Sequence, residues 1–365
     1  MADSEWHMAK SKEMGTSRKE LRAKSKQRRD DNKSKDKPMR RKLFGLTLSA
    51  MLLAPCFPVQ AQQPTKIARI GFLSNNSLAA VSSWNEAFRE GLRELGYVEG
   101  KNIVIEYRFG EGKLERLPAM VAELVRLKVD VIVTGGPSAT RAAKEASATI
   151  PIVMATNTDP VGDGFVASLA RPGGNITGLS TLAPEISGKR LEILKEIVPR
   201  LSRVVVFETS TTPGTAQSLK ETELAAVAFG VKLNYLDIRA AKDIEAAFRA
   251  ASEERADAAL TLDSAVFNSQ RTQFVASAVK NRLPVIYHNS LFVEPGGLMS
   301  YGVNFTDLHR RAAVYVDKIL KGAKPGDLPV EQPKKFELII NLKAAKQIGL
   351  TIPPEVLARA NRLIK

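Results

Sequence analysis

IGFLSNNSLAAVSSWNEAFREGLREL (residues 70–95) contains the pattern that decides the fold of this chain. The stretch begins with a short apolar run, which predicts a buried strand. Small and polar residues follow, and charged residues then alternate with apolar residues spaced three and four apart, which predicts a helix with one buried face. The apolar positions of this helix are Val81, Trp84, Phe88, Leu92 and Leu95. A strand, a loop and a helix in this order form the repeating unit of an α/β fold.

The same unit recurs along the chain. Short apolar runs lie between amphipathic segments at VIV (131–133), PIVM (151–154), VVVF (204–207), LTL (260–262) and VIY (285–287). Runs that are apolar on both faces are typical of parallel strands covered by helices on each side. The sequence therefore predicts an α/β protein of Rossmann-like units with parallel sheets.

Two pauses in this alternation predict the domain organisation. Gly, Pro and Ser concentrate at 170–190 and at 294–304, as expected where the chain crosses between two lobes. Roughly 300 residues follow the N-terminal region, enough for two domains. We expect two lobes joined by a hinge, with residues 66–183 and 303–365 in lobe 1 and residues 184–302 in lobe 2.

The segment MRRKLFGLTLSAMLLAPCFPVQA (39–61) has the layout of an export signal: basic residues, an apolar run and small residues before a cleavage point. We expect cleavage near Ala61 and a periplasmic protein, because the apolar run is too short to span a bilayer permanently. Cys56 is the only cysteine and follows Pro55, which disfavours the alternative of a lipid-anchored protein. Removal of this segment would leave no thiol for disulfides, metal ligation or catalysis.

Residues 1–38 are polar and basic, a composition typical of a disordered segment. The sequence leaves two explanations open: a basic extension, or a start codon placed too early, with Met39 as the true first residue. Residues 1–42 carry fifteen basic and seven acidic side chains, which is +8 of the net charge of +15. The remaining charge is spread widely, so no nucleic-acid partner is predicted.

Three segments carry a resemblance: TDPVGDGFVASLARPGGNITGLS (158–180), GKRLEILKEIVPRLSRVVVF (188–207) and PVIYHNSLFVEPGGLMSYGVN (284–304). Together with GLTIPPEVLARANRLI (349–364), they resemble the periplasmic substrate-binding components of bacterial ABC transporters, in the group related to tryptophan- and tyrosine-binding proteins. The resemblance implies a type I periplasmic binding protein fold that closes on a small amino-acid-like ligand, with an aromatic amino acid preferred. It further implies delivery of the ligand to an ABC permease with separate ATPase subunits, and no cofactor.

Polar loops after the strands of lobe 1 are the first part of the predicted ligand site, since ligands of α/β sheets bind beyond the carboxyl ends of the strands. We expect the start of the helix at Ser138 to bind a carboxylate, because free N–H groups there attract anions. The alternative is that these side chains only cap helices. The candidate residues of lobe 1 are Ser74, Asn75, Gly136, Ser138, Thr156, Asn157 and Asp159.

In lobe 2, Asp263 follows a predicted strand and is expected to receive a ligand ammonium group. Tyr287 offers an aromatic wall, although an aromatic at such a position is more often part of the core. Ser210, Thr211 and Asn304 complete the candidates. Polar loops on one lobe facing an acid on the other predict an α-amino acid or a similarly small zwitterion.

Other classes of function find less support. GDGFVA (162–167) matches the dinucleotide pattern G-x-G-x-x-A, but it begins several residues after its strand, so an enzyme of this type is a remote alternative. His288 and His309 do not have metal-ligand spacing, and no catalytic or metal-binding residues are predicted. An exported sensor with the same fold is a further alternative. The sequence does not decide between a sensor and a transport receptor.

Overall fold

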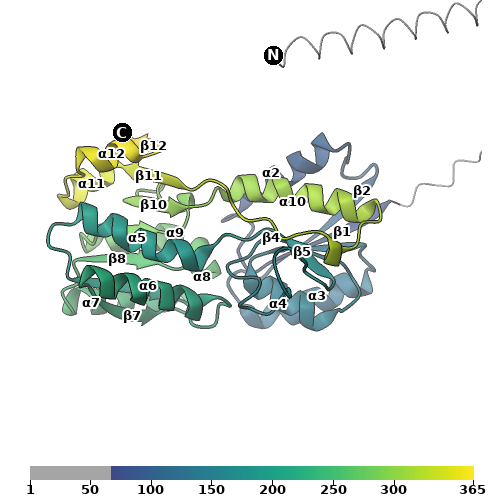
Figure 1. The fold of residues 1–365 in the computed structure, drawn as a ribbon, viewed down its shortest axis with the longest axis horizontal. Coiled ribbons are helices and arrows are strands. Elements are labelled where there is room, and N and C mark those ends of the chain that lie inside the picture. Colours follow the sequence, from purple (N-terminus) through teal and green to yellow (C-terminus); the bar gives the residue numbers. More distant parts are fainter. Residues whose placement is uncertain (1–66) are drawn as a thin grey trace, which may run out of the picture. The chain divides into compact units, whose positions relative to one another are not determined.

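The computed structural model of this protein describes residues 67–365. The predicted extension (1–38) and export signal (39–61), with its cleavage point, lie outside the described residues. Two β-sheets organise the described chain (Figure 1). Lobe 1 is built on the first sheet and lobe 2 on the second.

The sheet of lobe 1 has five parallel strands in the order β2-β1-β3-β4-β5. Their bounds are β1 (Ala68–Ser74), β2 (Ile103–Phe109), β3 (Val131–Gly135), β4 (Ile152–Thr156) and β5 (Ile176–Gly178). Helices α2 (Ser82–Glu94) and α10 (Phe305–Leu320) pack side by side on one face, and α3 (Leu117–Arg126) and α4 (Pro137–Ala146) cover the other (Figure 1). Because both faces are covered, successive residues of one strand are buried on opposite sides, as Phe72 and Leu73 are.

The sheet of lobe 2 has seven strands in the order β12-β11-β10-β9-β8-β6-β7. Their bounds are β6 (Arg203–Glu208), β7 (Lys232–Asp237), β8 (Ala258–Thr261), β9 (Val285–Tyr287), β10 (Met299–Gly302), β11 (Glu337–Asn341) and β12 (Arg362–Ile364). The helices of this lobe are α5 (Ala183–Ile197), α6 (Thr215–Phe229), α7 (Ile244–Glu253), α8 (Ala265–Ser269), α9 (Arg271–Lys280), α11 (Leu342–Ile348) and α12 (Pro354–Arg359). The predicted α/β class, with parallel sheets in two lobes, is confirmed.

The helix predicted from residues 81–95 is α2, and its apolar positions Trp84, Phe88 and Leu92 are buried. Leu95 follows the end of the helix and is 36% exposed. Among residues 67–365, no helix is both long and apolar enough to cross a membrane.

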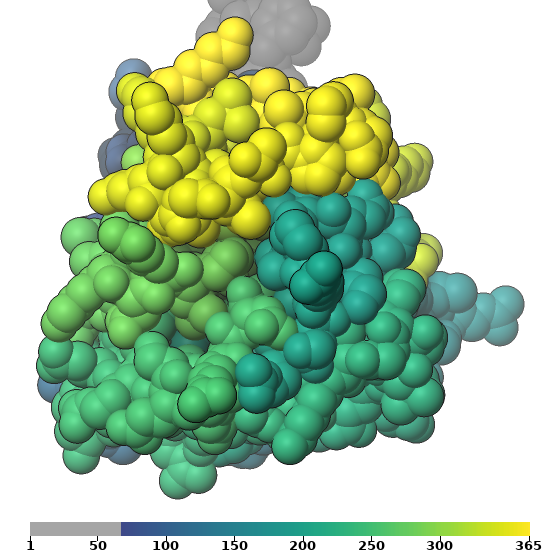
Figure 2. All heavy atoms as spheres, turned by 90° about the vertical axis from the view of Figure 1, so that its left-hand side faces the viewer, coloured from purple at the N-terminus to yellow at the C-terminus, as the bar shows by residue number. Residues whose placement is uncertain are grey.

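The chain crosses between the lobes three times, where the sequence predicts two crossings. It enters lobe 2 after β5, returns after β10 into helix α10, and crosses again after residues 330–331, which hydrogen-bond to the backbone of Leu169 and Gly178 in lobe 1. The strands β11 and β12 that follow belong to lobe 2, because β11 pairs with β10 and β12 pairs with β11. Figure 2 shows this C-terminal part, in yellow, against the teal and green segments of lobe 2.

The predicted boundary of lobe 1 is therefore corrected. Residues 305–320 belong to it as expected, since α10 packs on α2 and on the first sheet. The expectation fails for residues 337–364, which complete the sheet of lobe 2. The antiparallel pairing of β10 with β11 causes the difference, and it joins segments far apart in the sequence.

Candidate ligand-binding cleft

A cavity lies between the lobes at the carboxyl ends of parallel strands from both sheets. The space within it that a water-sized molecule can occupy is about 30 Å³. Five of the twelve predicted site residues line it: Asn75, Gly136, Ser138, Thr156 and Asp263.

The register of the first sheet explains why three loops meet in this cavity. Ser74 at the end of β1 is level with Gly135 at the end of β3, which is in turn level with Thr156 at the end of β4. The residues that follow β1 and β3 therefore open side by side at one edge of the sheet. Spacing along the sequence places the polar residues after each strand, and the parallel pairing brings them together.

The N-terminus of α4 forms the anion-attracting part of the wall. Gly136 occupies the N-cap position with φ of +118°, a conformation that side-chain-bearing residues rarely adopt. Ser138 lies inside the first turn, and within the described residues no side chain caps this helix. The capping alternative for Ser138 is thus not what the structure shows. The first N–H groups of α4 lack intrahelical partners and carry the positive end of the helix dipole.

Asp263 provides the negative wall of lobe 2. Its side chain is 19% exposed, and its Oδ1 lies 3.3 Å from Nε2 of His288. Burial raises the pKa of Asp263 to about 6, while the Arg190 charge and the N–H of Ser264 limit the rise. Ser264, not Asp263, caps helix α8, since its hydroxyl accepts the N–H of Val266. Asp263 therefore does not cap this helix.

Two buried groups behind Asp263 were not predicted as site residues. Arg190 on α5 is 2% exposed and donates from Nε to the Tyr301 carbonyl (2.8 Å) and from Nη2 to the His288 carbonyl (3.4 Å). Burial lowers the pKa of Arg190 to about 10, so it stays charged at neutral pH. Burial and the Arg190 charge hold the pKa of His288 well below its usual range, so the imidazole is neutral. In the sequence, Arg190 is spaced with Ile186, Leu194 and Ile197 on one apolar helix face. This spacing is the signal that could have placed a buried charge behind Asp263.

The aromatic wall comes from residues that were not predicted for this role. The rings of Trp84 and Phe305 stack with centroids 4.7 Å apart, and both line the cavity. Tyr287 is fully buried in the core of lobe 2, stacked on Phe292 at 4.7 Å. The prediction that Tyr287 forms a ligand wall is wrong, because its strand turns this side chain into the helical layer. Trp84 was assigned only to the buried face of its helix.

Ser74 and Asn304 also lie elsewhere than expected. The Ser74 hydroxyl donates to the Gly135 carbonyl (3.2 Å) and accepts from the N–H and the Nδ2 of Asn76, so its hydrogen-bonding capacity is used within the protein. Asn304 caps α10 by accepting the N–H of Asp307 and donates to Glu337. It lines a different cavity, at the hinge. Neither side chain is placed to contact a molecule in the cleft.

The remaining predicted residues do not line this cavity. Asp159 accepts the N–H of Gly162 in a turn, and Ser210 hydrogen-bonds to Asp237 on the exposed end of β7. Thr211 lines two further openings of the cleft. Asn157 is 1% exposed, and neither polar atom of its side chain has a partner among the described residues.

The remaining sequence motifs do not form an enzyme site in the described residues. Residues 161–167 form turns, and no helix starts at the G-x-G-x-x-A pattern, so the strand-to-helix turn of a dinucleotide site is missing from residues 67–365. Within this same part of the chain, no group of three or more His, Cys, Asp and Glu side chains could hold a metal ion. His309 donates from Nδ1 to the Phe305 carbonyl and packs near Trp84.

Comparisons with known proteins agree with this geometry. Residues 66–364 match the family described as ABC transporter substrate binding protein. A tyrosine-binding protein of Clostridioides difficile (strain R20291) is 27% identical over 277 residues, covering 73% of this chain and 76% of that protein. A conserved domain protein from Vibrio cholerae is 31% identical, with a TM-score of 0.78 over 82% of this chain and 100% of that one. An ABC domain from Streptococcus pneumoniae in complex with L-Trp is 27% identical, with a TM-score of 0.76 over 81% and 99% of the two chains.

Proposed function

This chain belongs to the ABC transporter substrate binding protein family, and from this premise we propose that it binds a free α-amino acid in the cleft between its lobes. One observation carries the proposal: the N-terminus of α4 and the carboxylate of Asp263 line the same cavity from opposite lobes. A molecule with both an acid group and an ammonium group matches this pair. Closure of the lobes would bury it between them, a hinge motion that the ligand favours through contacts made only in the closed state.

Each end of the zwitterion has a stated partner. The free N–H groups at the start of α4 and the Ser138 hydroxyl attract the carboxylate. The carboxylate of Asp263 receives the ammonium group. Burial raises the pKa of this carboxyl, and the positive charge of Arg190 opposes the rise, so Asp263 stays ionised at neutral pH. Asn75 and Thr156 lie at the same cavity and offer further hydrogen bonds to the acid group.

An aromatic side chain on the ligand is the preferred case. Trp84 and Phe305 give the cavity an apolar wall on which a ring can pack. The relatives named above include a tyrosine-binding protein and a domain solved with L-Trp, which supports the same class. L-tryptophan and L-tyrosine are therefore the first ligands to test.

The biological role that follows is that of a receptor for an ABC importer. The closed, loaded protein would dock on a membrane permease, and separate ATPase subunits would supply the energy. Export through the segment at residues 39–61 would bring the protein to the periplasm. We expect the N-terminal sequence of the mature protein to begin at Gln62; a mature chain that retains residues 39–61 would contradict the export proposal.

A ligand panel tests the proposed function. The protein is unfolded, dialysed and refolded to remove copurified ligand, and thermal unfolding is then followed with each of the common amino acids. L-tryptophan or L-tyrosine should raise the midpoint, as any ligand specific for the folded state does. The methyl ester and the N-acetyl derivative of the best ligand are the controls, since each lacks one of the two charges. Equal stabilisation by these derivatives, or none by any amino acid, would refute the proposal.

Ligand affinity should depend on pH through Asp263. Its pKa is raised to about 6, so below this pH the carboxyl becomes neutral and no longer attracts an ammonium group. We expect the affinity to be fully present above the pKa and to fall about tenfold per pH unit below it. Isothermal titration calorimetry between about pH 4.5 and 7.5 measures this slope.

Two variants identify the carboxyl group that causes the pH dependence of the affinity. Burial also raises the pKa of Asp163 to about 6, but Asp163 does not line the cavity. Asp163→Asn should therefore keep the pH slope, whereas Asp263→Asn should bind weakly at every pH with no slope. A slope that disappears in Asp163→Asn and persists in Asp263→Asn would assign the effect to the wrong carboxyl.

A further inference from the structure

A chain of hydrogen bonds starts in lobe 2 at Thr261 and His288. The backbone N–H of His288 donates to the Thr261 hydroxyl (3.1 Å), and this hydroxyl also lies 2.9 Å from Nδ1 of His288. Oδ1 of Asn289 accepts the N–H of Leu291, so Nδ2 of Asn289 faces Asn268 and donates to its Oδ1. The Asn268 atom beside His288 is therefore an acceptor, and the ring proton of the neutral imidazole lies on Nε2. Nε2 is 3.1 Å from Oδ1 of Asn268 and therefore donates to it.

The chain then crosses to lobe 1. Oδ1 of Asn268 also accepts from Nδ2 of Asn289 (2.8 Å), so two donors fix the orientation of the Asn268 amide. Its Nδ2 consequently donates to Oδ1 of Asn76 in lobe 1 (3.1 Å). Nδ2 of Asn76 donates to the Ser74 hydroxyl (3.2 Å), which donates to the Gly135 carbonyl (3.2 Å).

Every donor in this chain points in the same direction. Its side chains are buried: Asn76 is the most exposed at 6%, and His288 and Asn268 are each 2% exposed. Turning either amide over would set donor against donor or acceptor against acceptor at buried side chains, where an unsatisfied polar group is costly. The chain therefore has one arrangement, and His288 in its neutral form determines it from the lobe 2 end.

We propose that this hydrogen-bond chain is a latch that holds the cleft closed before any ligand binds, with His288 as its positioning residue. The latch lies at the cleft to which the proposed function assigns the ligand, but its hydrogen bonds join protein groups alone and do not involve a ligand. It also explains the placement of Ser74, whose hydroxyl serves lobe closure. In this state Asn268, which lines the cavity, joins the strand ends of one lobe to those of the other.

Other bonds between the lobes differ from the latch in their surroundings. The N–H of Ser77 donates to the Ser269 hydroxyl (3.1 Å), and Arg271 donates to the Ala80 carbonyl (3.2 Å), both at partly exposed positions. Thr158 donates to the Pro213 carbonyl (3.2 Å) at a buried position, beside Asp163. Water can replace the exposed bonds when they break, so each contributes little to closure. The latch is both buried and continuous.

The latch sets the equilibrium between open and closed protein, and thereby ligand binding. A closed form populated without ligand lowers the cost of closure and raises affinity, while entry of the ligand waits for opening. Weakening the latch should therefore open the ligand-free protein and speed ligand association. A merely structural Asn76 would change neither.

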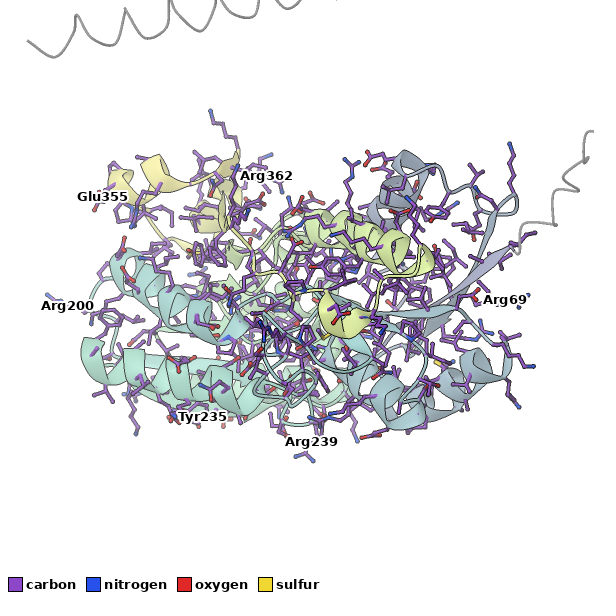
Figure 3. The ribbon with its side chains drawn as sticks, turned by 45° about the vertical axis from the view of Figure 1, so that its right-hand side comes forward. Arg69, Arg200, Tyr235, Arg239, Glu355 and Arg362 are labelled. Carbon is purple, nitrogen blue, oxygen red and sulfur yellow. The ribbon has the colours of Figure 1, made fainter. Side chains whose placement is uncertain are left out.

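Distances between spin labels test the latch in the ligand-free full chain. Glu115 in lobe 1 and Arg239 in lobe 2 are exposed and line the same opening of the cleft, and the Arg239 side chain extends outward from the ribbon (Figure 3). Cysteines at these two positions, with Cys56→Ser, carry the labels for double electron–electron resonance. The parent protein should populate mainly the short, closed distance. Asn76→Leu, which leaves Nδ2 of Asn268 without its partner, should shift the closed-to-open ratio at least about tenfold toward open.

Matched variants separate the latch from general destabilisation. Ser269→Ala, which removes a bond at the rim, should change the ratio less than about twofold. His288→Leu should open the cleft as Asn76→Leu does, and the double variant should open it no further, because both act on one chain. His288→Gln retains an amide donor and should restore closure. Asn76→Ala replaces Asn76→Leu if the latter does not fold. An unchanged ratio in the folded Asn76 variant, or equal opening by Ser269→Ala, would overturn the proposal whatever ligand the protein binds.

Discussion

Asp263→Asn is expected to lower the affinity for the amino-acid ligand about a hundredfold or more. The side chain keeps its size, so the variant removes mainly the charge that lies beside His288. Loss of one partner from a buried pair of opposite charges costs about 2 to 5 kcal/mol in binding, because the other charge is left without compensation. Isothermal titration calorimetry with the best ligand of the panel, at pH 7.5, measures the change.

Asp237→Asn is the control for this variant. Asp237 also ends a strand of lobe 2, but its carboxylate binds Ser210 and Arg239 and does not line the cavity. Its removal should leave affinity within about twofold of the parent. If Asp263→Asn bound the ligand as tightly as the parent, the ammonium would have another partner and the proposed orientation would be wrong.

Arg190→Leu is expected to lower the free energy of unfolding by about 3 to 5 kcal/mol, since breaking a buried charge pair from one side leaves the other charge uncompensated. The guanidinium is 2% exposed, it donates to the carbonyls of Tyr301 and His288, and it is the charge that limits the rise in the pKa of Asp263. Leucine would supply no donor for these groups. Urea denaturation of the ligand-free protein gives the free energy and shows whether its slope is unchanged.

Lys189 is the neighbouring residue on the same helix and provides a matched control. It pairs with Glu192 on a partly exposed surface, so Lys189→Leu should cost less than about 1 kcal/mol. The double variant Arg190→Leu with Asp263→Asn should be more stable than the sum of the two single effects predicts, because no buried charge then remains unbalanced. Strict additivity would show that the two charges do not interact.

Local patterns were sufficient for most of the architecture. The apolar runs predicted β1, β3, β4, β6, β8 and β9. A strand covered by helices on both faces is apolar at every position, so it appears in the sequence as a continuous apolar run. Strands β2 and β7 were not predicted from apolar runs. They lie at one edge of their sheets and carry polar residues such as Glu106 and Asn234, so they lack a continuous apolar run.

The candidate site divides along a similar line. Polar residues that directly follow a strand, such as Asn75, Thr156 and Asp263, line the cavity because the end of a parallel strand fixes their position. The sequence pattern did not predict whether a side chain at the end of a strand points into the cavity or into the core. Tyr287 is the last residue of its predicted strand, and the pleat of β9 turns it into the core. Phe305 follows the second crossing and reaches the cavity only because α10 returns to lobe 1.

The sequence alone determined the α/β class, the presence of two lobes and the polar loops that follow the strands of lobe 1, because these depend on spacing between near neighbours. The tertiary structure decided that residues 337–364 complete lobe 2, that Arg190 lies buried behind Asp263, and that Asn76 meets Asn268 across the cleft. Asn76 and Asn268 are 192 residues apart. Contacts over such separations form only when two complete lobes pack together, and local spacing does not encode that packing.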